Sequence, residues 1–82
     1  MIYKFQVDKD KFKTKLKERY SKFIIDDNIT LSRCYEMFCC EMNICRKTVF
    51  NFMNNHYSIQ LLMKVIEVLE VKDIEEIFKE IE

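Results

Sequence analysis

Residues 42–55 read MNICRKTVFNFMNN, and this stretch decides the fold that we predict. Apart from glycine, asparagine adopts the left-handed backbone conformation most readily, so Asn43 is expected to end one helix. A second helix is expected to follow at once, from about Cys45 to Asn54. Its inner face carries Thr48, Val49 and Phe52. The stretch therefore predicts two helices joined by a tight turn.

The outer face of this second helix is polar and cationic. It carries Arg46, Lys47, Phe50, Asn51 and Asn54, and it is followed by Asn55 and His56. No Asp or Glu occurs between Glu41 and Glu67, a gap that covers the whole helix. Repulsion by DNA phosphates would explain this gap, and chance is the competing explanation.

These residue types suit recognition of double-stranded DNA. In the major groove, Arg46 can hydrogen-bond guanine, Lys47 can reach guanine or phosphate, and Asn51 can bond adenine. Phe50 offers an apolar edge to a thymine methyl group. Phosphate contacts, which fix register without reading sequence, are expected from Asn54, Asn55 and His56. The competing interpretation is an ordinary solvated helix face and helix terminus.

Apolar residues at helical spacing predict four further helices. They run from Asp8 to near Ile25, from Thr30 or Ser32 to Met42, from Ile59 to Leu69, and from Asp73 onwards. N-cap side chains are available at Asp8, at Thr30 or Ser32, and at Ser58. The last helix would turn Ile74, Ile77, Phe78 and Ile81 to the core. With no glycine or proline, the predicted fold class is all-α with five helices.

Residues 1–7 are predicted to form a short strand or arm. Polar and apolar residues alternate there, so that Tyr3, Phe5 and Val7 share one side. A single strand has no partner within a helical domain. Either it lies as an arm on the helices, or it pairs with the same segment of a second subunit.

Length and composition point to one small domain, residues 1–82, with a dense apolar core. No apolar run approaches the roughly 20 residues of a membrane span, and the N-terminus lacks the apolar stretch of a secretory signal. We therefore expect a cytoplasmic protein without membrane contact.

The four cysteines, Cys34, Cys39, Cys40 and Cys45, do not have the usual spacing of a zinc site. Cys39 and Cys40 are neighbours on a predicted helix and would point about 100° apart. We interpret the cysteines as small apolar filler in a reducing cytosol, and we expect no metal and no cofactor.

The net charge is zero, but the charges are segregated along the chain. Residues 1–52 contain eleven Lys or Arg and seven Asp or Glu, a net charge of +4. Residues 53–82 contain three and seven, a net charge of −4. Such polarity can place a basic face on DNA and keep an acidic face away from it.

Residues 30–78, with the quoted segment at their centre, resemble the Cro and phage-repressor (XRE) family of helix-turn-helix proteins. The resemblance implies a lambda-repressor-like domain whose recognition helix is residues 45–54. The chain departs from the family pattern, which has glycine at Asn43 and Asn55, a capping serine at Cys45 and alanine at Cys39. A phosphate-contacting glutamine that often opens the second helix is absent, and Tyr35 lies near its place.

Residues 48–52 also look like the recognition helix of TetR-type regulators. Such regulators need a large ligand-binding domain after this helix, and too few residues follow here. The Cro and phage-repressor resemblance is therefore preferred, and no small-molecule substrate is expected.

Three functional hypotheses follow. The first is a sequence-specific DNA-binding transcriptional regulator, a repressor of phage or mobile-element type that acts as a homodimer. The second is a protein-binding helix-turn-helix module, an adaptor or inhibitor of mobile-element origin, which the neutral charge favours. An enzyme is the least favoured, because the chain has one histidine and no glycine-rich phosphate loop.

Surplus apolar residues on the fourth helix, Leu61, Met63 and Val68, either face a second subunit or are buried in the core.

Overall fold

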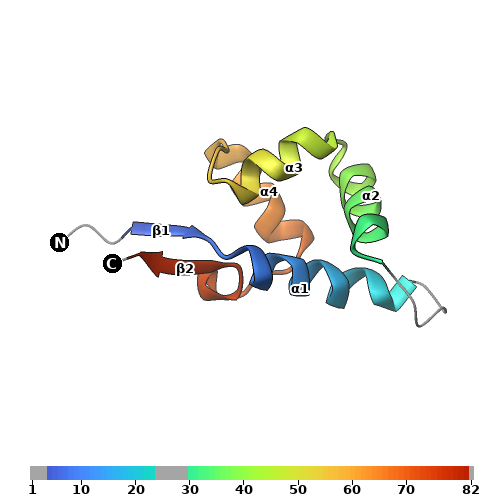
Figure 1. Cartoon of the computed structure of the whole chain (residues 1–82), viewed down its shortest axis with the longest axis horizontal. Coiled ribbons are helices and arrows are strands. Elements are labelled where there is room, and N and C mark those ends of the chain that lie inside the picture. Colours follow the sequence, from blue (N-terminus) through green and yellow to red (C-terminus); the bar gives the residue numbers. More distant parts are fainter. Residues whose placement is uncertain (1–3, 24–29, 82) are drawn as a thin grey trace.

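The computed structural model describes residues 4–23 and 30–81. Two short strands form one antiparallel ribbon, β1 (Lys4–Val7) and β2 (Phe78–Ile81). The α-helices are α1 (Lys9–Tyr20), α2 (Leu31–Met42), α3 (Arg46–Met53) and α4 (Ile59–Val68). Short 3-10 turns are η1 (Ser21–Phe23) and η2 (Ile74–Glu76). In Figure 1, α1 and the ribbon form a long base, and α2, α3 and α4 lie on one side of it.

The apolar residues of α1, Phe12, Leu16 and Tyr20, recur every four residues and are buried. The ring of Phe12 packs edge-on against Phe38 of α2, with 5.8 Å between centroids, and lies 5.3 Å from the ring of Phe52 of α3. Side chains three or four residues apart share one helix face, so this single stripe on α1 contacts two other helices. The helix ends at Tyr20, and the predicted end near Ile25 lies outside the described residues.

Three predicted N-caps are confirmed. The Asp8 side chain accepts hydrogen bonds from the Asp10 and Lys11 amides at 3.1 and 3.2 Å. Thr30, not Ser32, caps α2 by accepting from the Arg33 amide at 3.2 Å. The Ser58 hydroxyl accepts from the Leu61 amide at 3.1 Å. Each cap satisfies a backbone donor that has no partner within its own helix.

Three helices end in a left-handed residue although the chain has no glycine. Asn43, Asn55 and Glu70 follow α2, α3 and α4 with φ of 58°, 68° and 54°. In each case the amide of the following residue donates to a carbonyl of the last helical turn. Ile44 donates to the Cys39 carbonyl at 3.0 Å, His56 to the Asn51 carbonyl at 2.7 Å, and Val71 to the Ile66 carbonyl at 3.0 Å. This is the Schellman pattern of helix termination. The predicted stop at Asn43 is confirmed.

Glu70 is the unfavourable member of this set, because a left-handed conformation costs a residue with a Cβ about 1–2 kcal/mol unless its side chain compensates. We expect Glu70→Gly to raise the free energy of unfolding by about 0.5–1 kcal/mol, measured by urea denaturation. The matched control, Glu67→Gly, replaces an exposed glutamate within α4 and should lower it by up to about 1 kcal/mol. Destabilisation by both changes would contradict this account of the α4 terminus.

The ribbon corrects two expectations. Residues 4–7 form the predicted strand, but its partner is β2 of the same chain, with Val7 opposite Phe78 and Phe5 opposite Glu80. It is therefore not an arm lying on the helices, and it has a strand partner within its own chain. Val7 and Phe78 are buried together, so the ribbon is anchored at its inner end. Tyr3 lies outside the described residues.

The predicted helix from Asp73 is wrong. Residues after Asp73 make one 3-10 turn and then enter β2, so the described chain has four α-helices and a small sheet, not an all-α fold of five helices. Ile77 and Phe78 are core residues, as expected, but their burial does not require a helix. The N-terminal strand supplies a backbone partner from the other end of the chain, and this long-range pairing overrides the local helical pattern.

The cysteines are all free, and only part of the filler interpretation is confirmed. Cys34 is buried in the core, and Cys39 is half-buried where the family pattern has alanine. Cys40 and Cys45 are exposed, so neither fills the core.

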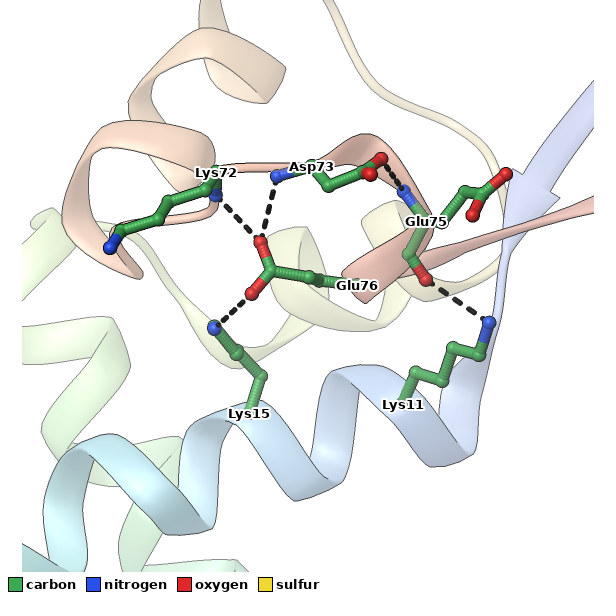
Figure 2. A network of polar contacts seen from close by, with 6 residues as sticks. All are labelled: Lys11, Lys15, Lys72, Asp73, Glu75 and Glu76. Carbon is green, nitrogen blue, oxygen red and sulfur yellow. Dashed lines mark hydrogen bonds and ion pairs between the residues drawn. The ribbon is translucent and has the colours of Figure 1, made fainter.

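Glu76 holds the turn before β2 against α1 (Figure 2). One carboxylate oxygen accepts hydrogen bonds from the amides of Lys72 and Asp73 at 2.6 and 2.9 Å, and the other pairs with Lys15 Nζ at 2.8 Å. The Asp73 amide, the Lys15 ammonium and the Lys72 amide lower the pKa of Glu76 to about 2. Lys11 of α1 adds a hydrogen bond from Nζ to the Glu75 carbonyl at 3.1 Å.

Because the pKa of Glu76 is lower in the folded chain than its ordinary value of 4.5, its ionised form stabilises the fold above about pH 4.5. This contribution is lost as the pH falls toward 2. We expect Glu76→Gln to lower the urea midpoint at pH 7, with the gap from the wild type closing as the pH falls toward 2. Glu75→Gln is the control, since its side chain lacks a partner among the described residues. A gap that does not depend on pH would contradict the assignment.

Candidate nucleic-acid interface

The inner face of α3 is fixed by the core. Val49, Phe52 and Met53 are buried, and only residues 43–45 separate α3 from α2. The Phe52 ring contacts Tyr57 and Phe78 with centroids 4.9 and 6.4 Å away, in addition to Phe12. Because these rings come from α1, β2 and the segment after α3, the helix cannot rotate without disturbing all of them.

The outer face of α3 is solvent-exposed, as the sequence predicts. The predicted residues on it share one side of the helix, and we call them the α3 ridge, namely Arg46, Lys47, Phe50, Asn51 and Asn54. Within residues 4–23 and 30–81, no hydrogen bond or ion pair engages the side chains of Lys47, Asn51 and Asn54. His56 beyond the helix is also exposed. The ridge can therefore meet an external partner without first breaking a salt bridge.

Arg46 lies against the start of α2. Its Nη2 donates to the Ser32 hydroxyl at 2.8 Å, and its guanidinium carbon is 5.9 Å from the centroid of the Tyr35 ring. An arginine has five N–H donors, so this arrangement orients the side chain and leaves donors for a second acceptor.

Tyr35 is the supporting residue that the sequence analysis missed. It is buried, its ring packs edge-on against Phe50 at 5.6 Å, and its hydroxyl donates to the Met53 sulfur at 3.6 Å. Burial raises the pKa of Tyr35. Tyr35 therefore packs beneath Phe50 of the ridge and supports it. No spacing in the sequence points to this role, because Tyr35 and Phe50 belong to different helices.

Cys45 caps α3 without a side-chain hydrogen bond to the backbone. Its sulfur lies 3.3 Å from the Thr48 hydroxyl, which is the main cause of a lowered pKa for this exposed thiol. Cys45 thus stands at the N-cap without the hydrogen bond that a serine would make there. The helix runs from Arg46 to Met53, one residue shorter at each end than the predicted range of 45–54.

Asn55 has a structural role that was not predicted. Its Oδ1 accepts a hydrogen bond from the Val7 amide at 2.7 Å, which joins β1 to the end of α3. The oxygen is therefore committed inside the fold, although the residue is exposed and adjoins the ridge. The position of the ribbon relative to α3 depends on this bond.

Replacing Asn55 by glycine should separate its two roles. Asn55→Gly keeps the left-handed conformation but removes the acceptor, so we expect the Val7 amide to exchange its hydrogen with solvent faster, by about fivefold or more. Amide exchange measured by NMR tests this. Asn43→Gly is the matched control, because it changes the same residue type in the same conformation and should leave Val7 unaffected. Equal exchange rates of the Val7 amide in the two variants would refute the hydrogen bond between Val7 and Asn55.

The nearest acid in the sequence before α3 is turned away from the ridge. Both oxygens of Glu41 bond to Arg19 of α1, and the Tyr20 hydroxyl donates to one of them at 2.7 Å. The hydrogen bonds from Arg19 are the main cause of the lowered pKa of Glu41. Both partners belong to α1, so this carboxylate is already engaged there and not with a residue of the ridge.

Comparisons with protein-family models, with curated proteins and with solved structures gave no match. The resemblance to Cro and phage repressors therefore stays a prediction from the sequence. Within residues 4–23 and 30–81, no helix has the length and apolar content needed to cross a bilayer. In the same part of the chain, no three His, Cys, Asp or Glu side chains gather as metal ligands.

Proposed function

We propose that this protein is a sequence-specific regulator that binds double-stranded DNA, with α2 and α3 acting as a helix-turn-helix and α3 entering the major groove. The observation that carries the proposal is the α3 ridge, which combines exposed cations and amides on a helix whose opposite face is fixed in the core. Base edges are read by such side chains when the helix that carries them is held rigidly. Repression by blocking a promoter is the regulatory mode that we propose.

The ridge residues differ in how far their side chains are held by contacts within the fold. Arg46 is pre-oriented by Ser32 and Tyr35, which lowers the entropy lost when it binds guanine. Asn51, about one turn further along, has both the oxygen and the nitrogen of its side-chain amide available for adenine. Lys47 and Asn54 face the same side and reach phosphate or base.

A homodimer is part of this proposal, because one small module buries too little surface for strong specific binding. Two copies would read half-sites about 34 Å apart. The most exposed large apolar side chains in the described chain are Ile59 and Met63, at 75% and 65%, one turn apart on α4. We propose that this flank of α4 contacts the second copy. Leu61 and Val68, the other surplus residues, are half-buried against the core.

Fluorescence anisotropy against duplexes selected from a random pool tests the function. Arg46→Ala and Asn51→Ala should each weaken binding of the selected duplex by about 5- to 150-fold and relax the preference at one base pair. Lys72→Ala is the control, an exposed lysine whose side chain makes no hydrogen bond or ion pair within the described residues. The wild type should bind with two chains per duplex. Absence of binding to any duplex, or equal loss in the control, would overturn the proposal.

A protein-binding module is the second candidate, favoured by one observation. Phe50 stands on the ridge with 44% of its surface exposed, where a protein partner could cover it. Phe50→Ala would then abolish capture of a protein from nuclease-treated lysate, whereas a thymine-methyl contact predicts a loss confined to DNA affinity.

A further inference from the structure

A polar cleft lies between the end of α3 and the ribbon. It has a volume of about 280 Å³ and is lined by Gln6, Lys9, Met53, Asn54, Asn55 and Lys79. In Figure 1, the yellow end of α3 lies above the ribbon, toward the left of the view. The cleft exists because β2 returns beside β1, which places Lys79 opposite Gln6.

The residues that line the cleft offer hydrogen-bond donors and positive charge. Two lysines and three amides supply hydrogen-bond donors, and no carboxylate lines the cleft. Lys9 and Lys79 are exposed, and within residues 4–23 and 30–81 neither side chain takes part in an ion pair or hydrogen bond. Two unpaired cations beside amide donors match the acceptor oxygens and negative charge of a phosphodiester.

We propose that this cleft holds a backbone phosphate of the same DNA that α3 reads, an assignment that rests on the proposed function. Asn54 belongs both to the α3 ridge and to the cleft, so the two surfaces are continuous. Phosphates border the major groove on both sides, so a helix in the groove brings its own end close to the backbone. Lys9, at the start of α1, and Lys79, on β2, thereby extend the interface beyond the helix pair.

The cleft suits a phosphate within a polymer better than a free anion. Its lysines are exposed, and their attraction for a single anion is screened by solvent and salt. Along DNA, by contrast, each neutralised phosphate releases condensed counterions, which makes exposed lysines effective. The Asn55 bond to Val7 fixes the ribbon edge beside α3, so the two walls of the cleft keep their spacing.

The test is the salt dependence of DNA affinity in a lysine double variant. Lys9→Gln with Lys79→Gln should reduce the slope of log affinity against log salt by about 2, roughly one for the cleft phosphate of each of the two chains on the duplex. Affinity should fall by the same factor for selected and unrelated duplexes, so the preference between them is unchanged.

The control double variant, Lys22→Gln with Lys72→Gln, removes the same charge from a cavity that carboxylates of Glu18, Glu70 and Glu76 also line. It should change the slope by less than half as much. Thermal melting confirms that both variants fold. If the two variants weaken DNA binding equally, the phosphate cleft is refuted while the proposed function stands. If the wild type binds no duplex, both fail. Shifts of the Lys79 and Asn54 NMR signals on adding inorganic phosphate alone would assign the cleft to a free anion instead.

Discussion

The packing of Phe52 is the contact on which the rest of the molecule depends. Its ring meets Phe12 of α1, Tyr57 in the segment after α3, and Phe78 of β2, so one side chain joins both ends of the chain to the middle. Aromatic pairs of this kind add about 0.5–1.5 kcal/mol each beyond the area that they bury. This packing also fixes the orientation of α3, because holding the inner face of an eight-residue helix determines where its outer face points.

A chain without glycine must end its helices with residues that have side chains, and this one places asparagine at two of these positions. Asn43 and Asn55 adopt the conformation that glycine would supply at less cost. At Asn55 the added side chain is an advantage, since its oxygen takes the Val7 amide and sets the ribbon beside α3. Glycine there would end the helix equally well but would leave the strand without that bond.

The parts of the fold that the sequence predicts correctly are those whose signals are local. Asn43 ends α2, Thr30 caps it, and the ridge residues share a face because their spacing follows the helical period. The strand β2 was missed because its hydrogen-bonding partner, β1, lies more than seventy residues away in the sequence. Phe78 is buried in a strand as it would be in a helix, so periodicity could not separate the two. The supporting role of Tyr35 and the structural bond of Asn55 were missed for the same reason, since neither contact is encoded by sequence spacing.

The zero net charge is compatible with a DNA-binding surface because some acids are paired with cations outside the proposed surface, whereas several cations of that surface are unpaired within the described residues. Glu76 bonds to Lys15 and Glu41 to Arg19, both on α1, so cations of α1 are paired there by acids from distant parts of the chain. Lys47 on α3 and the cleft residues Lys9 and Lys79 have no such partner among the described residues. Acids that are already paired do not neutralise these three lysines. Local charge, not the total, determines attraction to a polyanion at distances near the roughly 8 Å screening length of physiological salt.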